Sequence, residues 1–76
     1  MKNMDEVRKY WSLEYVERAC ETLDLAEALK YANRAIELDP LNGHAYLARC
    51  FVKQKLGFFE DGIKDSREAI RIFRLG

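Results

Sequence analysis

The sequence predicts an all-α domain built from four helices. Apolar residues recur at spacings of three and four along most of the chain, which is the periodicity of amphipathic helices. A single proline and four glycines lie mostly where one apolar pattern ends and the next begins. No segment alternates apolar and polar residues between turn-forming pairs, as a half-buried strand would. We therefore expect helices and no strands.

The first two expected helices have clear boundary residues. The first runs from about Asp5 to Thr22, with acidic residues in its first turn that suit the positive end of the helix dipole. The second begins after Asp24, which forms a capping-box pattern with Glu27, because carboxylates accept hydrogen bonds from backbone N–H groups at a helix start. Pro40 disfavours helical geometry in the residue before it, so this helix is expected to end there.

The last two expected helices are separated by a glycine. Asn42 is placed to cap the third helix, which runs from about Gly43 to Leu56. Gly57 supplies the left-handed residue that commonly follows a helix end. The fourth helix is expected from about Phe59 to Phe73.

An internal repeat relates the second and fourth helices. Displacing the chain by 34 residues places one on the other, whereas the first and third helices match poorly. The identical pairs in the matched helices are Lys30 with Lys64, Ala35 with Ala69, and Ile36 with Ile70.

Helix–turn–helix units of this length resemble the tetratricopeptide repeat. The most specific stretch runs from Ala28 to Pro40 with Ala35 between them, and the second unit has Gly62 and Ala69 at the places of the two alanines. Small side chains at these places let facing helices approach closely. The resemblance implies a right-handed α–α superhelix of two such units in a single domain. The expected division is 1–8 as an extension of the first helix, about 9–42 as unit one, and about 43–76 as unit two.

The chain departs from the family pattern at several places. Leu23 stands where the family usually has a turn glycine, and Trp11 lies one residue from the expected aromatic place. Many repeats carry an arginine at the place of Arg49 together with an aspartate at the place of Asp65, so the resemblance implies an ion pair between the third and fourth helices. Lys53, at a place that is normally apolar, is expected to extend to the surface.

In this family the first helix of each unit lines a concave groove for extended or helical peptides, so the resemblance implies a protein-binding scaffold. Leu13, Leu47 and Phe51 are expected to form an apolar strip there, although Leu47 and Phe51 fit core positions nearly as well. The chaperone-type clamp on a C-terminal carboxylate is not expected, because its Lys, Asn and Arg residues are missing. The groove residues are Tyr10, Leu13, Glu17, Cys20, Glu21, His44, Leu47, Phe51, Gln54 and Lys55.

Self-association is a second class of function. Ile70, Ile72 and Phe73 are expected to lack full cover, because no proline or Asn-type cap follows to begin another helix. Either the chain is an excised fragment, or its last helix docks on another copy to form a homo-oligomer. Residues 1–40 hold six Lys/Arg and nine Asp/Glu, a balance of −3, whereas residues 41–76 hold seven and four, a balance of +3. Solvated helix faces are the favoured explanation of this uneven charge, and head-to-tail association of oppositely charged ends is the alternative.

Catalysis, a metal and a cofactor are not expected. His44 is the only imidazole and has no nucleophile arranged beside it, and the sequence has no phosphate-binding glycine loop. Structural zinc needs about four ligands, whereas Cys20 and Cys50 are the only cysteines. Two cysteines within helical patterns indicate a reducing compartment, and no apolar run predicts a membrane span, so a cytoplasmic protein is expected.

Nucleic-acid binding is a third and weaker class. Thirteen basic and thirteen acidic residues give no net charge, which argues against a dedicated nucleic-acid or polybasic membrane-binding protein. The basic residues of the second half alternate with acidic ones at distances that suit pairing within a helix. A solvated, salt-bridged helix face is therefore the favoured interpretation.

Overall fold

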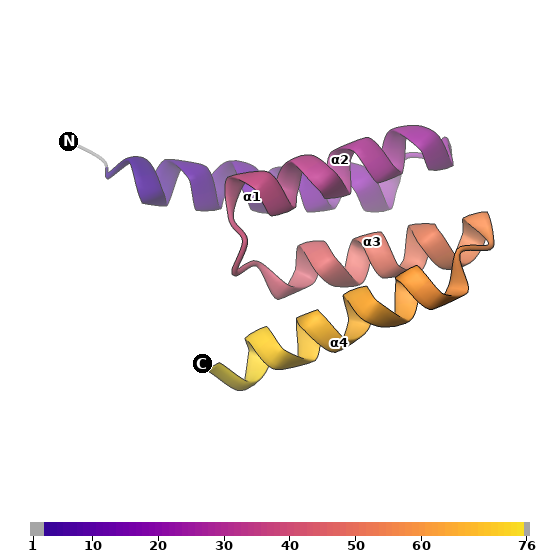
Figure 1. Ribbon diagram of the computed structural model, residues 1–76. Coiled ribbons are helices and arrows are strands. Elements are labelled where there is room, and N and C mark those ends of the chain that lie inside the picture. The colour runs from indigo at the N-terminus through magenta and orange to yellow at the C-terminus, as the bar shows by residue number, and fades with distance from the viewer. Residues whose placement is uncertain (1–2, 76) are drawn as a thin grey trace.

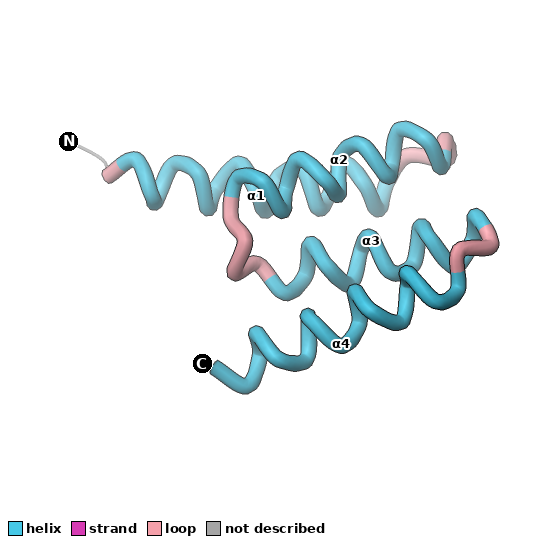
Figure 2. Tube along the Cα trace, viewed as in Figure 1, coloured by secondary structure: helices cyan, strands magenta, loops and turns pink. Residues whose placement is uncertain are grey.

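The structure, a computed structural model, describes residues 3–75, and within them it contains four α-helices and no strand (Figures 1 and 2). The predicted all-α fold is confirmed, and each helix lies within two residues of its predicted bounds. Residues 1–2 and 76 of the predicted domain lie outside the described residues. The helices are α1 (Met4–Glu21), α2 (Leu25–Leu38), α3 (Gly43–Leu56) and α4 (Phe59–Leu75).

Local hydrogen bonds fix the helix starts. The Asn3 carboxamide oxygen accepts from the backbone N–H of Asp5 at 2.8 Å and caps α1. The Asp24 carboxylate accepts from the backbone N–H groups of Ala26 and Glu27 at 2.9 and 3.2 Å, which confirms its half of the predicted capping box. The Asp24 N–H donates to the Thr22 hydroxyl at 3.3 Å and not to Glu27, so the other half is not formed. A side chain that accepts these bonds satisfies N–H groups that the helix itself leaves without partners.

Residues in the turns on either side of α3 likewise set the two ends of that helix. The Asn42 side chain accepts from the backbone N–H of His44 at 3.1 Å, which confirms it as the cap of α3. Gly57 ends α3 with a φ of 92°, a left-handed conformation that side-chain-bearing residues rarely adopt.

The helices pack sequentially in antiparallel pairs. In Figure 1 α1 and α2 form one hairpin, and α3 and α4 form a second hairpin beside it. Within the described residues α2 contacts α1 and α3, and α1 also contacts α3, whereas α4 contacts α3 alone. A bundle closed on itself would bring α4 against α1. The hairpins instead lie in sequence, and the molecule is flat, with extents of 43 × 28 × 15 Å.

The core is made mostly of small side chains. Ala19, Ala32 and Ala48 meet where α1, α2 and α3 come together, with Val16 and Tyr31 packed around them. Because alanine side chains are small, the helix backbones approach closely and pack densely without large side chains between them. In the second hairpin Gly62 has this role, because a Cβ atom there would lie 3.2 Å from the Cys50 carbonyl oxygen. Several large apolar residues, among them Phe51, Phe59 and Ile70, are left exposed at the surface.

Among the described helices, none has both the length and the apolar character needed to cross a lipid bilayer.

Candidate binding surface on helices α1 and α3

The predicted groove residues lie on the two adjoining helices α1 and α3. Most of them are solvent-exposed, including the large apolar side chains of Tyr10 (57%), Leu13 (52%) and Phe51 (64%). Leu47 is half-buried, so it belongs partly to the core, as the alternative interpretation held. The other members of the predicted set are exposed charged or polar residues and one cysteine: Glu17, Cys20, Glu21, His44, Gln54 and Lys55.

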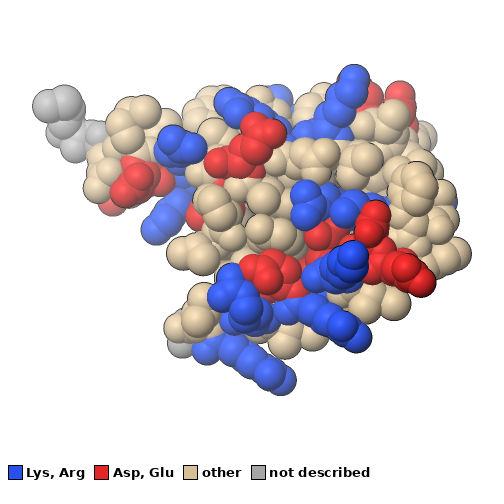
Figure 3. Space-filling view, viewed as in Figure 1, with Lys and Arg blue, Asp and Glu red and all other residues tan. Residues whose placement is uncertain are grey.

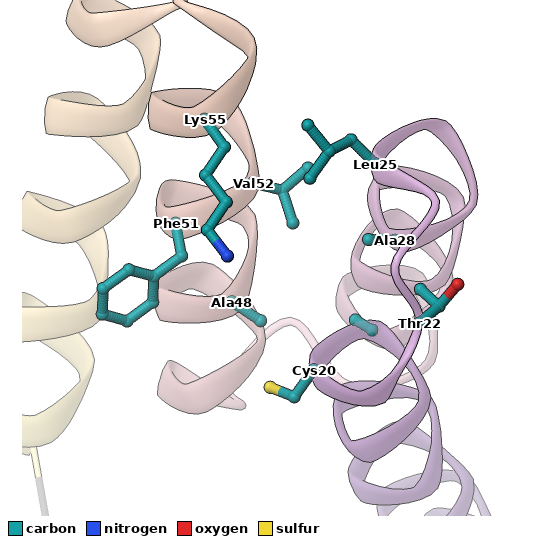
Figure 4. Close-up of a pocket in the computed structure, with 9 residues that line it drawn as sticks. Cys20, Thr22, Leu25, Ala28, Ala48, Phe51, Val52 and Lys55 are labelled. Carbon is teal, nitrogen blue, oxygen red and sulfur yellow. The ribbon is translucent and has the colours of Figure 1, made fainter.

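A hollow of about 180 Å³ lies between the α1–α2 turn and α3; we call it the turn-end hollow. In Figure 4 the Leu25 and Val52 side chains point toward each other across it, and the Cys20 sulfur points from α1 toward α3. Phe51 and Lys55 lie on its α3 side. The structure therefore brings together three of the predicted groove residues. The lining consists of Ala19 and Cys20 from α1, Thr22 directly after it, Leu25 and Ala28 from α2, and Ala48, Phe51, Val52 and Lys55 from α3.

A second, more open hollow of about 360 Å³ lies at the start of α3; we call it the α3-start hollow. Leu13 and His44 both line it, together with Ile72 and Phe73 from α4. The His44 and Phe73 rings pack edge to face with centroids 5.2 Å apart. The two hollows thus divide the predicted groove residues. Tyr10, Glu17, Leu47, Glu21 and Gln54 line neither of them.

A neutral hydrogen-bond network holds α1 at its position relative to α3. The fully buried Ser12 hydroxyl donates to the Ala35 carbonyl oxygen at 2.7 Å and accepts from the Asn42 side-chain N–H at 2.9 Å. These bonds connect α1, α2 and the cap of α3. Ser12 was not among the residues predicted from the sequence, where its only signal is a small polar residue between Trp11 and Leu13. Trp11, in contrast, is 42% exposed, so the core position belongs to the serine.

A charged network joins α2, α3 and α4. The predicted pair is present: the Arg49 guanidinium donates to both carboxylate oxygens of Asp65, at 2.9 and 2.7 Å. Arg49 also donates to the Asn33 side-chain oxygen at 3.1 Å and so links the two hairpins. The Lys53 Nζ atom lies 3.1 Å from Oδ2 of Asp65, and the Lys53 side chain is only 19% exposed. The expectation that Lys53 extends to the surface was wrong, because a buried carboxylate with two oxygens can accept from both cations.

The environment of Asp65 sets its ionisation. Burial by itself raises the pKa of this carboxyl, but hydrogen bonds from Arg49 and Lys53 outweigh burial and hold the pKa below its ordinary value. The same hydrogen bond from Arg49 to Asp65 raises the pKa of the guanidinium. Arg49 and Asp65 are therefore both charged at neutral pH, and their ion pair joins α3 to α4.

The residues expected to drive self-association divide into two groups. Ile70 and Phe73 are 49% and 47% exposed, whereas Ile72 is buried at 8%. The assignment of Ile72 to a self-association surface was wrong. Under the 34-residue displacement Ile72 corresponds to Leu38, which is half-buried in the first hairpin.

Within residues 3–75 no three histidine, cysteine or acidic side chains lie close enough together to hold a metal ion. Every buried side-chain nitrogen or oxygen in this range has a hydrogen-bond partner. The arrangement offers apolar surface with charged borders, and this can bind another molecule by burial and charge.

Searches for known relatives gave no family model, curated protein or solved structure with a significant match to this chain.

Proposed function

We propose that this chain is a non-catalytic protein-interaction module made of two tetratricopeptide-like units, and that it binds an extended peptide across α1 and α3. The observation that carries the proposal is Phe51. Its ring is 64% exposed on the border of the turn-end hollow, where apolar surface remains in contact with water until a ligand covers it. Free Cys20 and Cys50 suit a reducing, cytoplasmic setting for such a scaffold.

Contacts at equivalent places support the two-unit interpretation. Displacement by 34 residues places Tyr15 on Arg49 and Tyr31 on Asp65. The two tyrosine rings lie 5.9 Å apart between α1 and α2, just as the charged pair joins α3 to α4. The helix pairs therefore meet at the same relative positions despite different chemistry. A constant offset between two such hairpins is what a right-handed superhelix requires.

The turn-end hollow fits one apolar side chain. Its volume of about 180 Å³ is comparable with an apolar cavity of about 150 Å³ that accommodates benzene. Val52 and Leu25 provide the facing apolar walls, Phe51 lies on the α3 border with its ring directed away from them, and the Lys55 ammonium group places a positive charge on the same border. The ligand is therefore a peptide with a large apolar residue beside an aspartate or glutamate, since a buried anchor with a charged neighbour combines affinity with orientation.

The experiment is selection from a display library of random dodecapeptides, followed by fluorescence anisotropy with the enriched sequence. Enriched peptides should carry a large apolar residue adjacent to an acidic one. Phe51→Ala should weaken binding about tenfold or more, because it removes the exposed aromatic side chain on the border of the hollow. Phe58→Ala is the matched control, with 55% exposure in the α3–α4 turn, and should leave affinity unchanged.

A charge reversal tests the orientation of the peptide. Lys55→Glu should lower affinity for the acidic peptide and shift a fresh selection toward basic neighbours of the apolar residue. Selection without enrichment, or equal losses with Phe51→Ala and Phe58→Ala, would contradict the proposal.

A further inference from the structure

Helix α4 has an uncovered side that α2 does not have. Within the described residues α2 contacts both α1 and α3, whereas α4 contacts α3 alone. Phe59, Ile63, Ser66 and Ile70 follow one another at spacings of four, three and four, so they lie along one side of α4. We call this side the α4 outer face. Three of its four residues are large and apolar, with exposed fractions of 63% for Phe59, 46% for Ile63 and 49% for Ile70.

Under the 34-residue displacement, the α4 outer face corresponds to a face of α2 that is covered in the folded chain. The corresponding residues in α2 are all buried or half-buried, and Ala32 among them packs directly in the cluster with Ala48 of α3. The same displacement relates α3 to α1, so α1 of another copy would take the place that α3 has beside α2. The pairs in α2 and α4 are Leu25 with Phe59, Leu29 with Ile63, Ala32 with Ser66, and Ile36 with Ile70.

On α1 the residues equivalent to the packing face of α3 remain accessible. Trp11 corresponds to Ala45, and Glu14 corresponds to Ala48. Trp11 is 42% exposed, and Glu14 is half-buried. We call Trp11, Glu14 and Arg18 the α1 outer face. It places one large aromatic ring, a carboxylate and a guanidinium where α3 has small residues.

The distribution of charge indicates how α4 would be oriented against α1 of a second copy. The start of α2 lies against the end of α3, since Leu25 and Val52 line one hollow, so the two helices are antiparallel. The same arrangement would place the last turns of α4, which carry Arg71 and Arg74, beside the first turn of α1, which carries acidic residues. Figure 3 shows basic side chains along the lower edge of the molecule, over α4. Phe59, at the other end, would meet the cation of Arg18.

We propose that the α4 outer face binds the α1 outer face of a second copy of this chain, head to tail, as α2 binds α3. The contact is heterologous, because it uses two different surfaces of the same molecule. In such a dimer one copy keeps an unused α1 outer face and the other keeps an unused α4 outer face, so association continues beyond the dimer. Apolar contact through Ile70 and Trp11 contributes most of the affinity, and the charged residues align the helices.

Sedimentation equilibrium up to millimolar concentration tests the proposal. The wild-type chain should form species larger than a dimer, and added salt should weaken their association. Ile70→Asp and Trp11→Asp should each weaken self-association at least about tenfold. A mixture of these two variants should form a dimer and nothing larger, because one has an intact α1 outer face and the other an intact α4 outer face.

Controls separate this result from misfolding and from a general effect of an added surface charge. Leu23→Asp, at a side chain 99% exposed in the α1–α2 turn, should associate as the wild type does. Unchanged circular dichroism in Ile70→Asp and Trp11→Asp establishes that they fold. A wild-type chain that stays monomeric, or a mixture of the two variants that fails to form a dimer, would overturn the proposal. Trp11→Asp with undiminished association would show that α4 pairs with α4 instead.

Discussion

The two hairpins hold their helices together by different chemistry at equivalent places. In the first, the rings of Tyr15 and Tyr31 lie 5.9 Å apart. In the second, the same places are Arg49 and Asp65, which form a two-bond ion pair. The place of Lys53 in the first hairpin is Ala19, which packs in the alanine cluster. Residues that correspond under the 34-residue displacement therefore meet in both hairpins, although their chemistry differs.

This difference predicts that the second hairpin depends on its ions. Asp65→Ala should lower the free energy of unfolding by about 3 kcal/mol or more, because it leaves two largely buried cations without a counter-charge. Urea unfolding followed by circular dichroism measures the loss. Glu68→Ala, which breaks only the exposed pair with Arg71, is the control and should change stability little. Equal effects of the two substitutions would contradict the structural role of the network.

A smaller loss is expected in the first hairpin, whose buried polar contact is neutral. Ser12→Ala should lower the free energy of unfolding by about 1–2 kcal/mol, because the buried Asn42 side-chain N–H loses its acceptor. Ser66→Ala removes a hydroxyl that bonds only within α4 and serves as the matched control. If the two serine substitutions destabilise equally, Ser12 does not connect the helices as described.

Much of the fold was predictable because its determinants are local. Asp24, Asn42 and Gly57 set helix ends through hydrogen bonds and backbone conformations within a few residues of themselves. Arg49 and Asp65 were predicted from resemblance to a family pattern. Lys53 was misplaced, because its partner depends on how α3 and α4 are rotated about their axes.

The candidate binding surface was predicted only in part. The repeat places identified exposed residues on α1 and α3, but they did not reveal that two separate hollows divide them. The hollows depend on residues outside the pattern, such as Leu25 in α2 and Phe73 in α4. Ser12 was missed since a single buried hydroxyl leaves no periodic signal. For Ile72, the match with Leu38 was the signal that would have placed it in the core.

Acid should affect the second hairpin selectively. The pKa of Asp65 is lower in the folded chain than in the unfolded one, so its ionisation contributes stability that is complete above about pH 4. The contribution is lost as the pH falls through the lower folded-state pKa. Urea unfolding at a series of acidic pH values should therefore show a steeper decline for the wild type than for Asp65→Asn. Parallel declines would rule out Asp65 as a source of acid sensitivity.

The smallest change in stability is expected when the charged residues of the second hairpin are replaced by the residues at the corresponding places of the first. The triple variant Arg49→Tyr, Lys53→Ala, Asp65→Tyr gives the second hairpin the residues of the first. It should be within about 1 kcal/mol of the wild type, because replacing a whole buried ionic network by packed side chains is often close to neutral. Its stability should then exceed that of Asp65→Ala. If the triple variant is the less stable of the two, the places are not equivalent.

The most direct test of the stacked arrangement is a nuclear Overhauser measurement between alanine methyl groups. It is made on the Ile70→Asp variant, in which the proposed association is blocked. Ala19 of α1 should show a cross-peak to Ala48 of α3, with which it packs, and none to Ala69 of α4, since α4 contacts α3 alone. A cross-peak between Ala19 and Ala69 would show a closed four-helix bundle and remove the open surface of α1 and α3.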